Sequence, residues 1–175
     1  MKKITTRIDF FKERPGMVIA ELGVFKGDFS RQLLECEPSM LILVDIWSGA
    51  MSCGNKDGHN QVYVDNMEVV YREIVREFTL PNVLICKDTS ADFLSGLEDN
   101  SLDCVYIDTT HEYEMTREEL MTSRPKVKPG GWITGHDYNV SSVARAVDEF
   151  CEIYDLEIEY LSEDGNPSFY IINTK

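Results

Sequence analysis

Short apolar runs alternate with amphipathic stretches along most of this chain, and this alternation limits the folds open to it. The apolar runs lie at 17–20, 41–44, 83–86, 104–107 and 132–134. They are continuous instead of alternating with polar residues, which is typical of parallel strands covered on both faces. The helical patterns between them lie at 29–35, 61–78, 91–97, 115–123 and 141–151. We therefore expect a doubly wound α/β fold.

The end of the chain has a different pattern. Two further apolar runs, 156–161 and 168–172, flank a segment rich in turn residues at 162–167. Such an arrangement predicts a hairpin-like antiparallel pair that ends an otherwise parallel sheet. Because 175 residues suit one domain of ordinary size, we expect a single domain over 1–175.

The charge balance narrows the range of partners. There are 17 Lys and Arg residues against 31 Asp and Glu residues, a net charge of −14. Binding to nucleic acid or to an anionic membrane needs a basic face, and the sequence has no Lys/Arg cluster of that kind. It also has neither an apolar run near the ~20 residues of a membrane span nor a signal peptide. We expect a cytoplasmic protein with a small-molecule substrate, and without a nucleic-acid or membrane partner.

Two features stay open to more than one interpretation. The five cysteines form an odd set without C-x-x-C spacing, which favours buried thiols in a reducing compartment. The polar, glycine-rich segment 48–60 is long for a connection between a strand and a helix, where about 2–6 residues are usual. It is equally consistent with a lid over a ligand and with a disordered surface insertion.

Acidic residues follow the predicted strands at the edge where α/β sheets bind ligands. They are Glu21, Asp45, Asp88, Asp108 and Asp137. A solvated loop carboxylate would explain any one of them. Five carboxylates on one edge are hard to keep ionised without a cationic partner. The set therefore predicts a crevice that attracts a cationic small molecule.

The first of these loops carries two glycines, Gly23 and Gly27, directly between a strand and a helix. Glycine permits a positive φ and a close approach of ligand to backbone. The spacing differs from the G-x-G-x-x-G dinucleotide fingerprint, which disfavours a nicotinamide-dependent oxidoreductase. Asp45 ends the next strand, where a carboxylate can accept both hydroxyls of a ribose.

These segments resemble the class I S-adenosylmethionine-dependent methyltransferases from Val18 onward. Glu21-Leu22-Gly23-Val24-Phe25-Lys26-Gly27 is similar to their first motif, E-x-G-x-x-x-G, and Pro129-Gly130-Gly131 to their turn into strand five. Asp45 resembles their ribose-binding acid, and Lys87-Asp88-Thr89-Ser90 the segment around the adenine. The resemblance implies a Rossmann-like, mostly parallel seven-stranded sheet with helices on both faces and a C-terminal antiparallel pair. It also implies S-adenosylmethionine as the cofactor, bound by Glu21, Gly23, Gly27, Asp45, Asp88, Thr89 and Asp108.

A second group of residues bears on the chemistry. Asp108 and His111 follow the fourth strand, and His136 and Asp137 follow the fifth. Adjacent strands lie ~4.8 Å apart, so Asp108 and Asp137 can converge, and paired carboxylates need a cation or a shared proton. Mg²⁺ suits such oxygen ligands. His111 fits two roles equally well, a general base that titrates near neutral pH or a cap of the following helix.

This half of the chain resembles the macrocin-type sugar O-methyltransferases, whose strand-four motif reads approximately D-G-x-H-x-Y. By that resemblance Asp108 and Asp137 bind a metal ion, Mg²⁺, and His111 deprotonates a substrate hydroxyl. Thr109 replaces the usual glycine, and His136 stands where some members have a carboxylate. Two other functions remain open: a non-catalytic cofactor-binding module, and a metal-dependent hydrolase that uses Asp108, His111 and Asp137. A homodimer is also open, because so compact a chain can borrow part of a lid from a second subunit.

Overall fold

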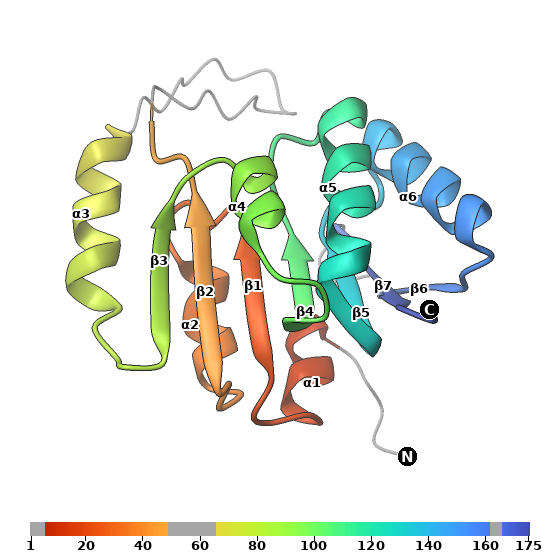
Figure 1. Cartoon of the computed structure of the whole chain (residues 1–175). Coiled ribbons are helices and arrows are strands. Elements are labelled where there is room, and N and C mark those ends of the chain that lie inside the picture. Colours follow the sequence, from red (N-terminus) through yellow and green to blue (C-terminus); the bar gives the residue numbers. More distant parts are fainter. Residues whose placement is uncertain (1–5, 49–65, 162–165) are drawn as a thin grey trace.

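The structure is a computed structural model that describes residues 6–48, 66–161 and 166–175 (Figure 1). Nearly all of the 48–60 segment, expected to be a lid or an insertion, lies outside the described residues. The described helices and strands are α1 (Arg7–Lys12), β1 (Val18–Leu22), α2 (Asp28–Leu34), β2 (Met40–Asp45), α3 (Met67–Glu77), β3 (Val83–Lys87), α4 (Ser90–Gly96), β4 (Leu102–Ile107), α5 (Tyr113–Lys126), β5 (Val127–Gly135), α6 (Ser141–Tyr154), β6 (Ile158–Leu161) and β7 (Ser168–Ile172).

The strands form one seven-stranded sheet in the order β3-β2-β1-β4-β5-β7-β6. Pairing is parallel from β3 through β5, and β7 is antiparallel to both of its neighbours, β5 and β6. The chain therefore places β2 and β3 on one side of β1, and then β4 to β7 on its other side. This arrangement confirms the predicted Rossmann-like, mostly parallel sheet with a C-terminal antiparallel pair.

Two apolar layers explain why the strand sequences are apolar without alternation. Ile19, Leu41 and Leu43 pack on one face of the sheet with buried residues of α1, α2 and α3. Their chain neighbours, including Ala20 and Ile42, pack on the other face with α4, α5 and α6. Both faces of β1 and β2 are thus covered by helices, as Figure 1 shows. Burial of both faces stabilises the sheet and leaves its carboxyl edge as the place where polar side chains gather.

Three details differ from the sequence expectations. Helix α1 was not predicted, because six residues are too few for a clear periodic pattern, although its Ile8 and Phe11 are buried. Helix α5 does not end before Pro125 but runs to Lys126. A proline in the last turn removes one backbone donor, and the Val127 N–H still donates to the Ser123 carbonyl.

The third difference concerns Pro129-Gly130-Gly131, expected as a turn that precedes strand five. These residues lie inside β5, where the pairing with β4 shifts from Leu102 opposite Val127 to Cys104 opposite Trp132. The segment is therefore an irregularity within the strand, a role for which glycine and an unpaired proline are suited.

The described residues bear on two further expectations, the absence of a membrane span and the state of the cysteines. Across the described ranges, no helix is both long and apolar enough to cross a membrane. Four cysteines have free thiols there, and Cys36, Cys104 and Cys151 are buried while Cys86 is half-buried. Cys53 lies outside the described residues.

Candidate active site at the carboxyl edge of the sheet

A cavity of about 330 Å³ lies beyond the carboxyl ends of β1, β2, β3 and β4. It brings together five of the residues predicted to bind the cofactor, namely Gly23, Asp45, Asp88, Thr89 and Asp108. Ser90, Thr109, Thr110 and Glu119 complete much of its polar lining. Glu21 and Gly27 are not among the residues that line it.

Asp45 holds the first loop in place through both of its carboxylate oxygens. Its Oδ2 accepts the Phe25 N–H at 2.8 Å, and its Oδ1 accepts the Trp47 N–H at 2.9 Å. The Trp47 indole N–H in turn donates to the Phe25 carbonyl at 3.0 Å. A carboxylate oxygen has more than one acceptor site, and Asp45 lines the cavity, so it can also accept hydroxyl donors from a ligand.

Gly23 is required by a close backbone approach between the loops that follow β1 and β4. Its φ is +88°, and a Cβ added there would lie 1.9 Å from the Asp108 carbonyl oxygen. The Gly23 N–H donates to the Val44 carbonyl at 2.9 Å, and the Asp108 N–H donates to the Leu22 carbonyl at 2.8 Å. These contacts place the first loop beside Asp108.

Glu21 and Gly27 lie away from the cavity for different reasons. Glu21 is 2% exposed and accepts the Ser30 hydroxyl at 2.5 Å. Burial raises the pKa of Glu21 to about 8, so its carboxyl is mostly protonated at neutral pH. Gly27 precedes α2 with a φ of +76°, and a Cβ there would lie 2.9 Å from both the Ile74 side chain and the Phe78 ring. Both residues thus contact α2 or α3 and stabilise the loop between β1 and α2 without lining the cavity.

Gly27→Ala is expected to lower the free energy of unfolding by about 1–2 kcal/mol, because a β-carbon is strained at positive φ. It should leave the affinity for S-adenosylmethionine, the ligand implied by the resemblance, within about threefold, a change below 1 kcal/mol. Urea unfolding and calorimetric titration measure the two quantities. A large loss of affinity with unchanged stability would instead place Gly27 at the ligand.

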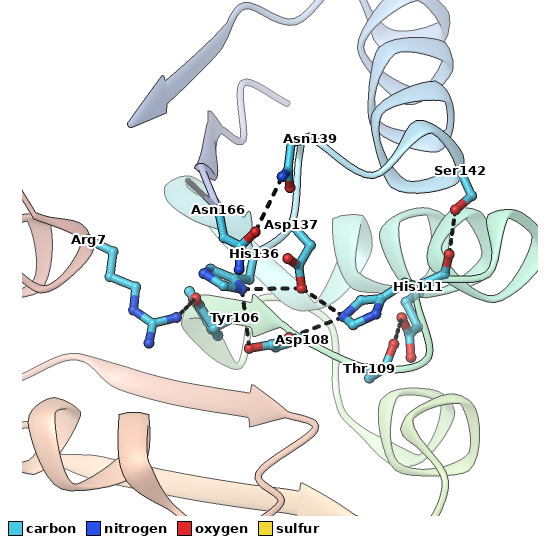
Figure 2. Close-up of polar contacts among 11 residues, drawn as sticks. Arg7, Tyr106, Asp108, Thr109, His111, His136, Asp137, Asn139, Ser142 and Asn166 are labelled. Carbon is cyan, nitrogen blue, oxygen red and sulfur yellow. Dashed lines mark hydrogen bonds and ion pairs between the residues drawn. The ribbon is translucent and has the colours of Figure 1, made fainter. Parts of the chain in front are cut away.

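Asp108, His111 and Asp137 form a compact cluster beside this cavity (Figure 2). One potential ligand atom from each lies within 4.8 Å of the others, as expected from the adjacent strands β4 and β5. The His111 Nε2 lies 2.9 Å from the Asp137 Oδ2 and 3.5 Å from the Asp108 Oδ1. The His136 Nδ1 approaches Asp137 Oδ2 at 3.3 Å and Asp108 Oδ2 at 3.8 Å.

The electrostatics of the cluster follow from these contacts. Hydrogen bonds to Asp108 and then Asp137 raise the pKa of His111 to about 10. Hydrogen bonds from His111 and His136 hold the pKa of Asp137 well below its usual range. At neutral pH the His111 imidazolium is therefore the cation that the paired carboxylates require. In this state His111 has no free nitrogen with which to accept a substrate proton.

The backbone around the cluster is held in an uncommon conformation. Of the seven described non-glycine residues with positive φ, four lie at this edge of the sheet, namely Phe25, Trp47, His111 and Asp137. The Ser142 hydroxyl donates to the His111 carbonyl at 2.6 Å and so fixes the turn from the side of α6. The imidazole of His111 does not cap α5, whose N-cap residue is Glu112. Such local strain is concentrated where surrounding contacts hold a site in shape.

Sequence reasoning missed Glu119, a cavity residue on α5. Its side chain is buried, at 1% exposed, and accepts the Ser90 hydroxyl at 2.5 Å and the Thr109 hydroxyl at 2.8 Å. Burial raises the pKa of Glu119. A signal was present, because Thr116, Leu120 and Ser123 share the buried helix face with it at helical spacing. An acid on such a face usually has polar partners.

Comparisons with known proteins identify the family and the fold. Residues 20–138 match the model of a family described as a methyltransferase domain. A search of curated protein sequences gave no significant match. Among solved structures, the O-methyltransferase NovP superposes with a TM-score of 0.69 at 22% identity, over 97% of this chain and 80% of that one. A rRNA methylase from Streptococcus thermophilus gives 0.66 at 12%, over 100% and 99%.

A SAM-dependent methyltransferase from Aquifex aeolicus superposes with a TM-score of 0.65 at 16% identity, over 95% of this chain and 87% of that one. At these identities the structures establish the fold, and the family match covers most of the chain. The sheet order β3-β2-β1-β4-β5-β7-β6 is that of the methyltransferase Rossmann-like fold. The chain therefore belongs to the methyltransferase domain family and has the class I S-adenosylmethionine-dependent methyltransferase fold.

Proposed function

We propose that this protein transfers a methyl group from S-adenosylmethionine to a hydroxyl oxygen of a small molecule, with a divalent metal ion at Asp108 and Asp137. The observation that carries the proposal is the double position of Asp108. It lines the cavity suited to the methyl donor, and it also belongs to the acid–histidine cluster. The two parts of a metal-assisted methyl transfer would therefore adjoin each other.

The cavity has the chemistry expected of a site for a cationic donor. Four carboxyl groups line it (Asp45, Asp88, Asp108 and Glu119), and no basic residue is among its lining within the described parts of the chain. The positive sulfonium of S-adenosylmethionine is attracted by such a wall. Asp45 would accept the ribose hydroxyls, and Asp88 and Thr89 would lie near the adenine.

The cluster also fits a divalent ion. The two carboxylates of Asp108 and Asp137 suit Mg²⁺ or Mn²⁺. A bound ion would supply Lewis-acid stabilisation of the acceptor oxygen as it gains negative charge. Because a metal ion and the His111 imidazolium would compete for the same two carboxylates, loading the site would displace the proton of His111.

His111 gains its proposed role once that proton has left. Its Nε2 then has a free lone pair beside Asp108 and Asp137 and can accept the hydroxyl proton of the acceptor. The acceptor oxygen forms the new bond to the methyl carbon while the carbon–sulfur bond breaks and its electron pair stays on sulfur. Holding donor and acceptor in line would supply much of the rate enhancement.

The choice of a small-molecule acceptor rests on charge. Structures with this fold include a rRNA methylase and a spermidine synthase as well as O-methyltransferases, so the fold alone does not select the acceptor. A net charge of −14 disfavours RNA, whose binding depends on neutralising phosphates.

Metal removal tests the proposal. Calorimetric titration of the metal-stripped protein should show saturable binding of S-adenosylmethionine. With a panel of hydroxylated acceptors, methyl transfer should fall by at least about 100-fold in excess chelator, as expected when Lewis-acid stabilisation is lost. Mg²⁺ or Mn²⁺ should restore it. Absence of donor binding would overturn the proposal, and full activity in chelator would overturn its metal part alone.

A further inference from the structure

The carboxylate of Glu119 links two segments that are distant in sequence. Ser90, its partner at 2.5 Å, begins α4 directly after the Asp88-Thr89 segment. Thr109, its partner at 2.8 Å, lies between Asp108 and the turn that carries His111. All three linked residues line the cavity. Because each carboxylate oxygen accepts one hydroxyl, the two hydrogen bonds join the two walls through one rigid helix.

Thr109 also lies between two hollows. It lines the cavity of about 330 Å³, and it lines a second hollow of about 10 Å³ together with His111 and His136. Thr109 is the residue that replaces glycine in the strand-four motif, and its hydroxyl is what reaches Glu119. The replacement therefore adds a side-chain tether to a turn that glycine would leave without one.

We infer that Glu119 is a positioning residue that ties the Ser90 side of the cavity to the turn carrying His111, so that occupancy of the cavity tightens this turn. The inference rests on the proposed function, since it takes the cavity ligand to be S-adenosylmethionine or its product. Coupling of this kind is expected where a hydrogen-bond chain connects two segments and ligand binding orders one of them.

Amide hydrogen exchange with S-adenosylhomocysteine as the probe tests the coupling. Calorimetry first gives the dissociation constant for each variant, and the ligand is then used at saturation so that differences in affinity cancel. In the wild-type protein we expect the amide of His111, which does not line the cavity, to gain about tenfold protection on binding, a size usual for such coupling. In Thr109→Val and in Glu119→Leu this gain should fall below about twofold, below the usual range of such coupling. The amides at the start of α4 should still gain protection in Thr109→Val, because that change leaves the Ser90 bond intact.

Two further variants distinguish coupling between the cavity and the His111 turn from simple stabilisation of that turn. Glu119→Gln keeps one acceptor and adds one donor, so it should restore much of the gain. Ser142→Ala removes the other bond that holds the turn, the one to the His111 carbonyl at 2.6 Å. It should lower protection of the turn in the ligand-free protein and yet retain the gain on binding.

Two results would overturn the inference while leaving the proposed function intact. One is wild-type protein that binds the probe without added protection at His111. The other is an undiminished gain in both Thr109→Val and Glu119→Leu. A wild-type protein that fails to bind the probe in the calorimetric step overturns the proposed function and this inference together.

Discussion

Asp45→Asn is expected to weaken S-adenosylmethionine binding by about 100-fold or more, because charge-assisted hydrogen bonds contribute roughly 1.5–3 kcal/mol each. Asp45 is 9% exposed and already accepts two backbone N–H groups, at Phe25 and Trp47. An asparagine has only one acceptor oxygen for these two donors. The substitution therefore removes an acceptor for the ribose and loosens the loop at once.

A ligand change separates these two effects. If Asp45 accepts a ribose hydroxyl, S-adenosylhomocysteine lacking the 2′-hydroxyl should bind the wild-type protein about tenfold more weakly than the intact ligand, as for one lost hydrogen bond. In Asp45→Asn this difference should disappear, as a double-mutant cycle requires. In Asp88→Asn, the matched change at the next strand end, it should persist. Persistence in Asp45→Asn would show that Asp45 acts only through the loop.

The sheet could be predicted from the sequence because β1, β2 and β4 are buried on both faces and therefore contain continuous apolar runs. The acids near the strand ends could be placed once the strands were predicted, because the carboxyl ends of parallel strands lie at one edge of the sheet. Asp45, Asp88 and Asp108 do line one cavity, and Asp137 lies beside Asp108. Periodicity is a local signal, and here it was enough to place four of the five acids at that edge.

Contacts between side chains that are distant in the sequence could not be predicted from it. Glu21 looks like a ligand-binding acid, yet its carboxyl is buried under the loop with Ser30. Helical spacing places Glu119 on the buried face of α5, but it does not show that the hydroxyls of Ser90 and Thr109, from other elements, donate to its carboxylate. The protonation of His111 follows from distances to Asp108 and Asp137 that no spacing rule gives.

Asp137→Asn is expected to weaken binding of Mn²⁺ by about 100-fold or more, because a neutral amide replaces an anionic ligand. The same change should lower the pKa of His111 from about 10 toward its ordinary value, since one of its two acidic partners is lost. Calorimetry measures the first quantity and nuclear magnetic resonance of the imidazole the second. Asp99→Asn, at an exposed carboxylate paired with Lys126, is the matched control and should change neither.

The raised pKa of His111 also determines whether the free energy of unfolding rises or falls with pH. In the ion-free protein its stabilising contribution is complete below pH ~6.5, the ordinary value, and is lost as pH rises through about 10. Its side chain is 42% exposed, so solvent screening should limit the loss to about 1–2 kcal/mol. In Asp137→Asn the decline should be smaller and complete at lower pH. A wild-type unfolding free energy that is flat from pH 6.5 to 10 would contradict the imidazolium assignment.

Proton release connects these measurements to catalysis. If Mn²⁺ takes the place of the His111 proton between Asp108 and Asp137, binding at pH 8 should release about one proton, seen as a dependence of the binding heat on the ionisation enthalpy of the buffer. Release should fall in His111→Gln, which has no such proton. Binding without release in the wild-type protein would mean that the ion does not displace the proton of His111. In that case the imidazolium persists beside the ion, and His111 cannot be the base that deprotonates the acceptor.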